Sequence, residues 1–362
     1  MSQWPEWLPL REDLAHLTPY GAPQVPAEAT LNTNENPYPP SPALARAIAQ
    51  RIETISETLN RYPDREAQEL RGGLASYINS LSNTAFTGAN IWPANGSNEV
   101  IQSLFLAFGR SSALGFTPSY SMHPLIAQVA GVAWRNGERN EDFSLNLEKA
   151  VNQIEREEAP LVFITTPNNP SGTSLSIREI ELLAKAVGKY GGLLVVDEAY
   201  AEFSREPSAV TLIPHYPHVI SIRTMSKAFA FAGARVGYLV AHPLVIDAMR
   251  IVRLPYHLSA LTQAAALTAL EFSTELLGNV ENLIQARERL ALELRECGLT
   301  VIPSSANFLL FGGFKQDAAE LWRSLLAEGV LIRDVGLLGY LRVTIGNEAE
   351  NERFLQALKK FL

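Results

Sequence analysis

Short apolar segments alternate with amphipathic helical segments through the middle of this 362-residue chain, and this alternation constrains the fold most strongly. Five segments are nearly all apolar and bounded by Gly, Pro or Asp: 113–116, 161–165, 193–196, 219–223 and 236–241. Such segments are typical of strands buried on both faces. Because helical segments separate most of them, the pattern predicts an α/β fold whose large domain has a mostly parallel central sheet flanked by helices.

The pattern changes after about residue 243. Two long helices are predicted at 258–277 and 279–297, and a strand–helix–strand–strand–helix set follows at 300–311, 317–328, 331–334, 340–345 and 347–362. Nine prolines in the first 42 residues predict an extended arm. We therefore expect an arm and part of a small domain at 1–42, a large domain at 43–242 and a smaller α/β domain at 243–362.

The charge and the cysteine content exclude several classes of protein. With 30 basic and 38 acidic side chains, the formal charge of −8 argues against a nucleic acid or an anionic membrane as partner. The single cysteine, Cys297, excludes an internal disulfide framework and a multi-cysteine metal site, and the scattered histidines predict no metal site. The uncharged stretch 111–134 contains two prolines and a histidine, so we expect no membrane span. The N-terminus lacks the layout of a signal peptide, and we expect a cytoplasmic protein.

A lysine follows the fourth apolar segment, in Thr224-Met-Ser226-Lys227, and Arg235 comes eight residues later. Small and apolar residues surround Lys227, so we expect a lowered pKa that makes its amine a nucleophile suited to a Schiff base. Thr224, Ser226 and Arg235 are residue types that bind a phosphate dianion. The alternative is a lysine whose ammonium group reaches solvent from a loop.

Polar side chains also follow two other predicted strands. Asp197, in Asp197-Glu-Ala-Tyr200, lies where α/β sheets bind ligands, and a buried carboxylate there needs a cation or several donors. Asn169, in Asn168-Asn169-Pro-Ser-Gly, can direct its amide at a ligand. The alternatives are a helix N-cap for Asp197 and a plain turn for Asn169.

Gly96, Ser97 and Asn98 precede an amphipathic helix. Unpaired N–H groups at such a helix start form an anion site, although Ser97 and Asn98 are also good capping residues. The sequence contains neither a P-loop nor a Gly-x-Gly-x-x-Gly motif, so no nucleotide-binding motif accounts for this site.

Together these segments resemble the fold type I aminotransferases, which use pyridoxal 5′-phosphate. Asn169-Pro-Ser-Gly, Asp197-Glu-Ala-Tyr200, Ser226-Lys227 and Arg235 match that family in order and spacing. More narrowly, the chain is similar to the histidinol-phosphate aminotransferases of class II. The segments that carry this narrower resemblance are Leu17-Thr-Pro-Tyr20, Leu31-Asn-Thr-Asn-Glu-Asn36-Pro-Tyr, Asn60-Arg-Tyr62-Pro, Pro118-Ser-Tyr120-Ser-Met, Leu331-Ile-Arg333-Asp-Val and Leu341-Arg342-Val-Thr-Ile-Gly. Ser171 replaces a frequent threonine and keeps the hydroxyl.

The resemblance implies a role for each segment. Lys227 would bind the cofactor covalently and, once released, move a proton between the substrate and the cofactor. Asp197 would pair with the pyridine nitrogen, Asn169 and Tyr200 would hydrogen-bond the ring hydroxyl, and Tyr120 would stack on the ring. The catalytic residues would be Lys227, Asp197 and Tyr200. Gly96 would contact the cofactor, and the phosphate would be bound by Ser97, Asn98, Thr224, Ser226 and Arg235, with Tyr62 from the second subunit of a homodimer.

The resemblance also implies a reaction. Histidinol phosphate and 2-oxoglutarate would be converted reversibly to imidazole-acetol phosphate and glutamate, in histidine biosynthesis. Arg342 would bind the carboxylate of glutamate with both arms of its guanidinium, and the substrate phosphate together with Arg333 and Tyr20. The residues expected at the substrate are Tyr20, Asn36, Tyr62, Tyr256, Arg333 and Arg342.

Other activities remain open at this point. An aromatic amino-acid aminotransferase on the same scaffold shares much of this pattern, and a threonine-phosphate decarboxylase is a more distant alternative. A transcription regulator with an aminotransferase-like domain would need a basic DNA-binding segment. Such a segment is not found in this acidic sequence.

Overall fold

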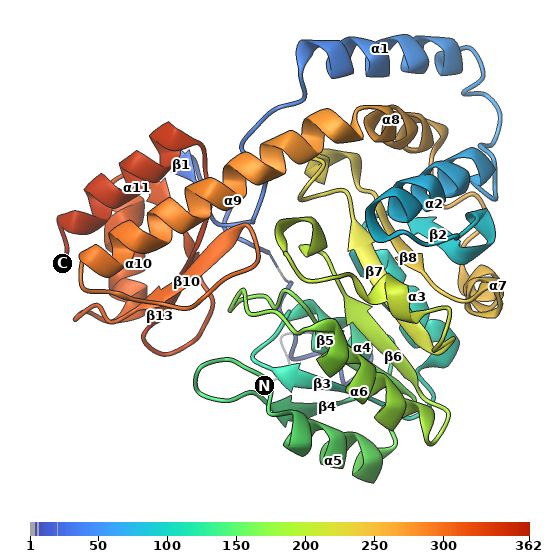
Figure 1. The fold of residues 1–362 in the computed structure, drawn as a ribbon, viewed down its shortest axis with the longest axis horizontal. Coiled ribbons are helices and arrows are strands. Elements are labelled where there is room, and N and C mark those ends of the chain that lie inside the picture. Colours follow the sequence, from blue (N-terminus) through green and yellow to red (C-terminus); the bar gives the residue numbers. More distant parts are fainter. Residues whose placement is uncertain (1–3, 6, 20) are drawn as a thin grey trace.

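The computed structural model describes residues 4–5, 7–19 and 21–362, and its larger part is built around a seven-stranded sheet (Figure 1). The strands, in spatial order, are β2 (Ile91–Ala94), β8 (Gly237–Val240), β7 (Val219–Thr224), β6 (Leu193–Asp197), β5 (Leu161–Thr165), β3 (Ser112–Thr117) and β4 (Ala133–Glu138). The strands from β7 to β4 are parallel, and β8 is antiparallel to both of its neighbours. The predicted α/β fold with a mostly parallel sheet is therefore confirmed.

The central strands are buried on both faces, as their apolar sequences predict. Along β5, Leu161 and Phe163 belong to one core cluster, whereas Val162 and Ile164 belong to another. This alternation follows from the two-residue period of a strand, and it explains why every position of β5 is apolar except the last.

Helices cover both faces of this sheet (Figure 1). Side chains of α3, α4 and α7 pack in one cluster, and those of α1, α2, α5 and α6 pack in the other. The helices of this part are α1 (Pro42–Ser56), α2 (Gln68–Ser82), α3 (Ser97–Phe108), α4 (Met122–Val129), α5 (Leu147–Glu157), α6 (Ile177–Gly188), α7 (Pro243–Val252) and α8 (Ala260–Glu271). At the start of α1, the Ser41 side chain accepts a hydrogen bond from the backbone N–H of Leu44, and Pro42 occupies the first turn.

A smaller α/β part follows along the long helix α9 (Ser273–Glu296), which runs from α8 into this part (Figure 1). Its antiparallel sheet has the order β12 (Arg333–Asp334), β13 (Tyr340–Thr344), β10 (Phe308–Gly312) and β9 (Thr300–Val301). Helices α10 (Ala318–Ala327) and α11 (Glu348–Lys359) complete it, and β1 (Ala29–Thr30) pairs in parallel with β11 (Val330–Leu331). The division at residues 42 and 242 stays a prediction; α7 and α8 pack on α1, α2 and α3 of the larger part.

The sequence-based boundaries are wrong at several places. The strands β2 and β4 were not expected, because Pro93 interrupts the one and most side chains of the other are exposed at the sheet edge. Gly278 does not separate the two long helices. The break is at Phe272 and Gly278 lies inside α9, because a single glycine costs a helix only about 1 kcal/mol. The strand expected at 300–311 is two antiparallel strands joined by a turn.

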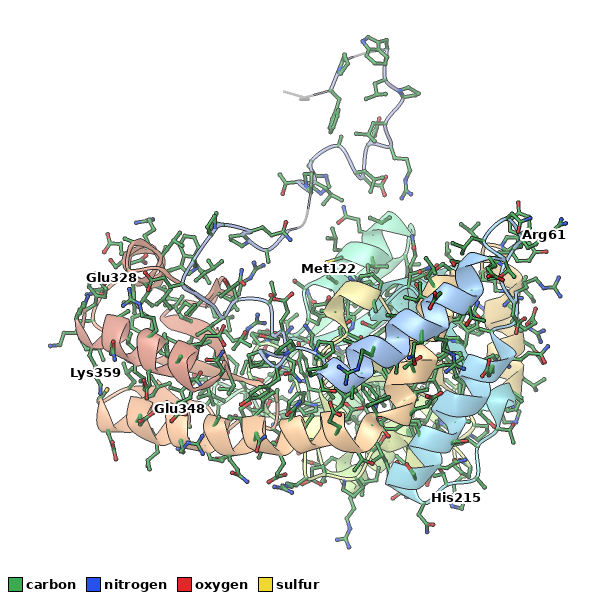
Figure 2. All side chains as sticks on the ribbon, turned by 90° about the horizontal axis from the view of Figure 1, so that it is seen from above. Arg61, Met122, His215, Glu328, Glu348 and Lys359 are labelled. Atoms are coloured by element: carbon green, nitrogen blue, oxygen red, sulfur yellow. The ribbon has the colours of Figure 1, made fainter. Side chains whose placement is uncertain are left out.

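In the described residues 7–19 and 21–28, the N-terminal arm has no helix or strand. The N-terminal arm projects away from the body of the molecule on the side where Met122 lies (Figure 2). Arg11 Nη1 donates to the carbonyl oxygen of Val129 at 2.9 Å, and Gln128 Nε2 donates to that of Asp13 at 2.7 Å. Within the described ranges, we find no helix with the length and apolar character that a membrane crossing requires.

Candidate active site

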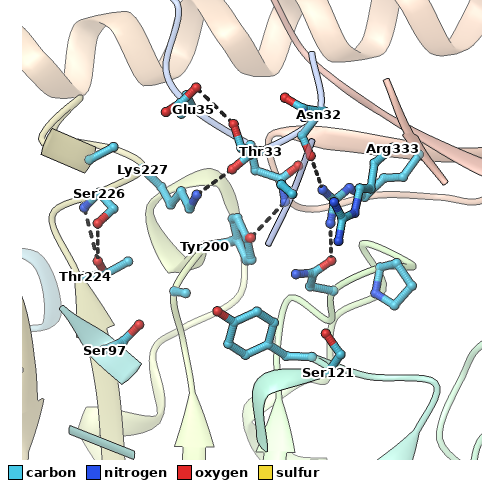
Figure 3. A pocket seen from close by; sticks show the side chains of 18 of the residues that line it. Asn32, Thr33, Glu35, Ser97, Ser121, Tyr200, Thr224, Ser226, Lys227 and Arg333 are labelled. Carbon is cyan, nitrogen blue, oxygen red and sulfur yellow. Dashed lines mark hydrogen bonds between the residues drawn. The ribbon is translucent and has the colours of Figure 1, made fainter. Parts of the chain in front are cut away.

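A cavity of about 650 Å³ opens where β5, β6 and β7 end, and the arm and the smaller part of the molecule close it from the other side (Figure 3). The carboxyl ends of parallel strands share one edge of a sheet, which is where α/β proteins bind ligands. Twelve of the predicted site residues line this cavity: Ser97, Asn98, Tyr120, Asn169, Asp197, Tyr200, Thr224, Ser226, Lys227, Arg235, Arg333 and Arg342.

One end of the cavity has the chemistry of a phosphate site. The Thr224 hydroxyl donates to Ser226 Oγ at 3.0 Å and accepts from the Ser226 N–H at 3.1 Å, so both hydroxyls are held at the end of β7. Gly96, at φ +84°, is the N-cap of α3, and a Cβ there would lie 2.7 Å from Arg235 Nη2. A glycine is therefore required for the guanidinium to approach the helix start, where N–H groups and a positive charge favour a dianion.

Neither Ser97 nor Asn98 is the N-cap of α3, and no side chain caps that end. Gly237 of β8 explains how the helix start comes so close to the sheet, because a Cβ at this position would lie 2.2 Å from the backbone nitrogen of Ser97. The alternative of a simple side-chain cap is thus not observed. Ser97 and Asn98, at the start of α3, instead line the cavity together with Arg235.

Lys227 points into the middle of the cavity (Figure 3). Its Nζ donates to the carbonyl oxygen of Thr33 at 2.8 Å, so the amine is held by the arm rather than by open solvent. Burial lowers the pKa of Lys227 to about 8, and the charges of Arg342 and Arg235 contribute in the same direction. This agrees with the lowered pKa that the apolar sequence around Lys227 predicts.

Asp197 ends β6 and is 3% exposed. Its Oδ2 lies 3.0 Å from His123 Nε2, and its Oδ1 accepts the N–H of Ala199 at 3.2 Å. The His123 ring is 1% exposed and lies against the rings of Tyr120 and Phe163. The sequence analysis assigned no role to His123. Its position three residues after Tyr120, at the start of a helix, is the only sequence signal that indicates one.

Arg342 lies at the other end of the cavity. Its Nη1 donates to Asn169 Oδ1 at 2.5 Å, and its Nη2 donates to the carbonyl oxygen of Asn32 at 2.8 Å. Arg333 of β12 is directly opposite Arg342 of β13 in the antiparallel register, so the two side chains share one face of the smaller sheet. This end therefore presents two guanidinium groups, which are suited to a carboxylate or a phosphate.

The structure also assigns the arm a larger part than the sequence analysis did. The backbone carbonyls of Asn32 and Thr33 accept hydrogen bonds from Arg342 and Lys227, and the Asn34 amide donates to the Tyr200 hydroxyl at 2.9 Å. Asn36, the arm residue expected at the substrate, instead donates to the Ala228 carbonyl at 3.4 Å and does not line the cavity. Tyr20, the other expected arm residue, lies outside the described residues.

Tyr62 and Tyr256 do not line the cavity of their own chain. Their rings stack with centroids 4.4 Å apart at the surface, where Tyr62 is 79% exposed and Tyr256 is 39% exposed. Contacts of these two residues with a substrate stay a prediction.

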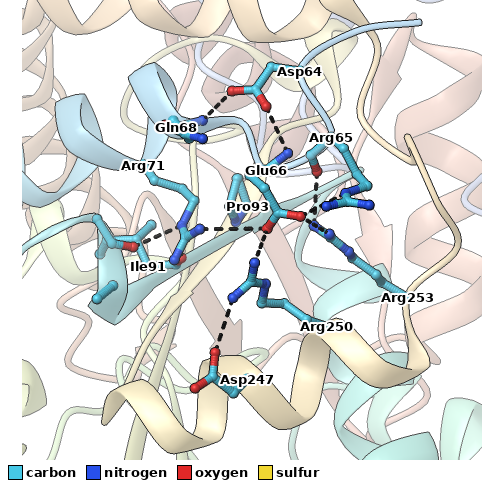
Figure 4. Close-up of polar contacts among 12 residues, drawn as sticks. Asp64, Arg65, Glu66, Gln68, Arg71, Ile91, Pro93, Asp247, Arg250 and Arg253 are labelled. Carbon is cyan, nitrogen blue, oxygen red and sulfur yellow. Dashed lines mark hydrogen bonds and ion pairs between the residues drawn. The ribbon is translucent and has the colours of Figure 1, made fainter.

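A cluster of arginines surrounds Glu66, which follows Tyr62 by four residues in the sequence (Figure 4). The carboxylate of Glu66, with a side chain 12% exposed, forms ion pairs with Arg65, Arg71, Arg250 and Arg253. Burial raises the pKa of Glu66, but the hydrogen bonds from Arg253 and Arg65 and the nearby positive charges lower it to about 2. The cluster joins the start of α2 to α7 and to the segment that precedes Tyr256.

Known proteins resemble this chain over nearly its whole length. The family model for aminotransferase class I and II matches residues 28–358. The histidinol-phosphate aminotransferase of Mycolicibacterium vanbaalenii is 53% identical over 97% of this chain and 95% of its own length. That of Corynebacterium glutamicum (strain R) is 49% identical over 98% and 97%.

Among solved structures, the histidinol-phosphate aminotransferase from Sinorhizobium meliloti in complex with pyridoxal-5′-phosphate superimposes with a TM-score of 0.82. It is 26% identical in sequence, and the match covers 93% of this chain and 91% of that one. The fold, the cavity at the strand ends and the matches in sequence agree, and the chain belongs to the family of class I and II aminotransferases.

Proposed function

We propose that this chain transfers an amino group between histidinol phosphate and 2-oxoglutarate, a reversible reaction that gives imidazole-acetol phosphate and glutamate in histidine biosynthesis. The observation that carries the proposal is the pair Arg333 and Arg342 on neighbouring strands, opposite the phosphate site at Arg235. One cavity thus offers separate cationic sites to a cofactor phosphate and to an anionic group of the substrate. The relatives named histidinol-phosphate aminotransferase, at about half identity, support the same substrate.

The cofactor of this family, pyridoxal 5′-phosphate, fits the residues that line the cavity. The hydroxyls of Thr224 and Ser226 with Arg235 would hold its phosphate, and Asp197 would hold its pyridine nitrogen. The buried carboxylate of Asp197, which would be costly without a cation or donors, supports this assignment because a protonated ring nitrogen would compensate its charge. When bound, the cofactor withdraws electrons from the α-carbon of the substrate.

The protein residues then have distinct tasks. Lys227, with a pKa near 8, would take a proton from the substrate α-carbon as a base and deliver it, as an acid, to the cofactor. His123 would keep the Asp197 carboxylate in place, and Tyr200 and Asn169 would hydrogen-bond the ring oxygen. Tyr120, whose hydroxyl donates to Asn98 Oδ1 at 3.2 Å, would lie against the ring.

Two substrates must use the same arginines. Glutamate has a carboxylate on its α-carbon, whereas histidinol phosphate has a phosphate ester at that end. Arg342 would bind the carboxylate as a fork, and Arg333 would join it when the larger, doubly charged phosphate is present. Arg342 already donates one hydrogen bond to Asn169, so its orientation does not have to be established on binding.

We also propose a homodimer in the cytoplasm. A homodimer would bring Tyr62 of one subunit to the phosphate site of the other, which gives a role to an aromatic ring that is 79% exposed in its own chain. The cytoplasm is supported by the single cysteine of the sequence.

A comparison of three amino donors tests the substrate. With 2-oxoglutarate as acceptor, we expect kcat/KM for histidinol phosphate to exceed that for phenylalanine and tyrosine. Arg333→Ala should lower kcat/KM for histidinol phosphate about tenfold or more, which is the effect of losing one hydrogen bond to a charged group. The same substitution should change kcat/KM for phenylalanine little. Equal or higher values for the aromatic amino acids would instead identify an aromatic amino-acid aminotransferase.

A further inference from the structure

Asn34 of the arm connects the smaller sheet to the catalytic Tyr200. It is 2% exposed and has a φ of +56°, a conformation that asparagine adopts more readily than most residues. Its N–H donates to Thr344 Oγ1 at 3.0 Å, and Asn307 Nδ2 donates to its carbonyl at 3.1 Å. The backbone of Asn34 is therefore held on the smaller part, while its side chain reaches Tyr200 in the larger one.

The hydrogen bonds around Asn34 have a definite direction. The Thr344 hydroxyl accepts the Asn34 N–H, and its own proton is donated to Asn34 Oδ1 at 3.1 Å. With its oxygen facing this donor, the Asn34 amide presents Nδ2 to the Tyr200 hydroxyl at 2.9 Å. If the Asn34 amide were reversed, Nδ2 as well as the backbone N–H of Asn34 would point at the Thr344 hydroxyl. The hydroxyl proton would then lose Oδ1 of Asn34 as its acceptor.

The direction of this chain determines what Tyr200 can do. A phenol oxygen carries one proton, and because Asn34 donates to that oxygen, the proton points away from the Asn34 amide. Tyr200 lines the cavity, and its ring is fixed edge-on against Phe308 at 5.1 Å between centroids. We propose that Asn34, oriented by Thr344, is a positioning residue that makes Tyr200 a hydrogen-bond donor toward the cofactor ring oxygen.

This donor has a measurable consequence for the cofactor. A donated hydrogen bond stabilises a full negative charge on the ring oxygen, which the high-pH form of the bound cofactor carries. The hydrogen bond from Tyr200 therefore lowers the midpoint of the titration, which is the pH at which half of the bound cofactor has changed its near-visible absorption. The proposal rests on cofactor binding and not on the choice of amino donor, because this titration contains no substrate.

The test is a double-mutant cycle on the holoenzyme, titrated by absorbance. Asn34→Asp tolerates the positive φ, and its carboxylate would accept the Tyr200 proton and turn it away from the ring. We expect the midpoint to rise by about one pH unit or more, as for one lost hydrogen bond to a charged atom, and Tyr200→Phe should act similarly. In the Tyr200→Phe background, Asn34→Asp should raise the midpoint much less. The charged groups that face the same cavity are unchanged in all four proteins: Glu35, Asp197, Lys227, Arg235, Arg333, Asp334 and Arg342.

Substitutions at Thr344 test the same chain without a new charge. Thr344→Val removes the hydroxyl that orients Asn34 and should raise the midpoint in the same direction by a smaller amount. Thr344→Ser keeps the hydroxyl and should leave the midpoint at the wild-type value. An equal rise from Asn34→Asp in both Tyr200 backgrounds would show an effect of charge alone and would overturn the proposal. Identical midpoints for Thr344→Val and Thr344→Ser would overturn it as well.

Discussion

The amine of Lys227 lies 2.8 Å from the carbonyl oxygen of Thr33, a residue 194 positions earlier in the chain. This contact joins the Pro-rich arm to the loop after β7 inside the cavity. Because burial and two arginines lower the pKa of this amine to about 8, a substantial fraction is neutral near physiological pH.

The rate of covalent cofactor binding should therefore depend on pH. Only the neutral amine attacks a carbonyl, so the rate for the apo-protein should rise about tenfold per pH unit well below pH 8 and level off above it. Near-visible absorbance after mixing with pyridoxal 5′-phosphate measures this rate. Lys227→Ala should give no covalent band at any pH, and a wild-type rate that is constant between pH 6 and 8 would contradict the assignment.

Local sequence patterns predicted the parts of the fold and site that depend on local contacts. The strand at 161–165 has the predicted bounds because both of its faces are buried, and the lowered pKa of Lys227 agrees with the small and apolar residues around it. The edge strand β4 was missed because its exposed side chains carry no such pattern.

Contacts between distant segments were not predictable in this way. Tyr200 receives its hydrogen bond from Asn34, and Asp197 contacts His123, across 166 and 74 positions of the chain. Neither pair leaves a periodicity or a spacing in the sequence. The fold creates both of them, by closing the arm and α4 over the ends of the strands.

Loss of His123 should weaken cofactor binding. Its ring holds the Asp197 carboxylate at 3.0 Å in a site where both side chains are buried. We expect His123→Leu to raise the Kd for pyridoxal 5′-phosphate and to lower kcat, each about tenfold or more. His123→Gln, whose amide nitrogen can occupy the place of Nε2, should recover most of both. Equal changes in Kd and kcat for His123→Gln and His123→Leu would mean that the contact with Asp197 does not explain the effect of His123.

Arg342 should matter for glutamate through its shape as well as its charge. Its guanidinium donates to both Asn169 and the Asn32 carbonyl, which a lysine cannot reproduce. We expect Arg342→Lys to lower kcat/KM of the glutamate half-reaction about 10- to 100-fold. The change in cofactor absorbance measures this half-reaction. Arg333→Ala should affect this half-reaction much less than it affects the one with histidinol phosphate. Parallel losses for both substrates in both variants would refute the division of tasks.

Glu66 should contribute to stability through its arginine cluster. Glu66→Gln keeps the size of the side chain but removes the carboxylate that four arginines share, of which only Arg250 has a further ion pair among the described residues, with Asp247, and we expect a loss of about 2 kcal/mol in the free energy of unfolding. Urea denaturation measures this loss. The matched control is Glu69→Gln, which removes an ion pair with Arg51 from a carboxylate 74% exposed and should cost less than about 1 kcal/mol.

The contribution of Glu66 should also disappear in acid. Its pKa is lowered from 4.5 to about 2 in the folded chain, so the unfolded chain takes up its proton first as the pH falls. The stability difference between the wild type and Glu66→Gln should thus be complete above pH 4.5 and shrink toward pH 2. A difference that stays constant over this interval would mean that the charge of Glu66 is not responsible.

Tyr62 can be tested for action across a dimer by complementation. When chains carrying Lys227→Ala and Tyr62→Ala are co-expressed with different tags, each mixed dimer would contain one site with a native Lys227 and a native Tyr62 from its partner. Random pairing should then restore about one quarter of the wild-type activity in the mixture, and purified dimers that carry both tags should show about one half. The control is a mixture of Lys227→Ala with Asp197→Asn, two residues of one and the same cavity, which should restore nothing because every site keeps one defect. Without any gain in the first mixture, Tyr62 would have to act within its own chain, and its exposed ring stacked on Tyr256 would need another explanation.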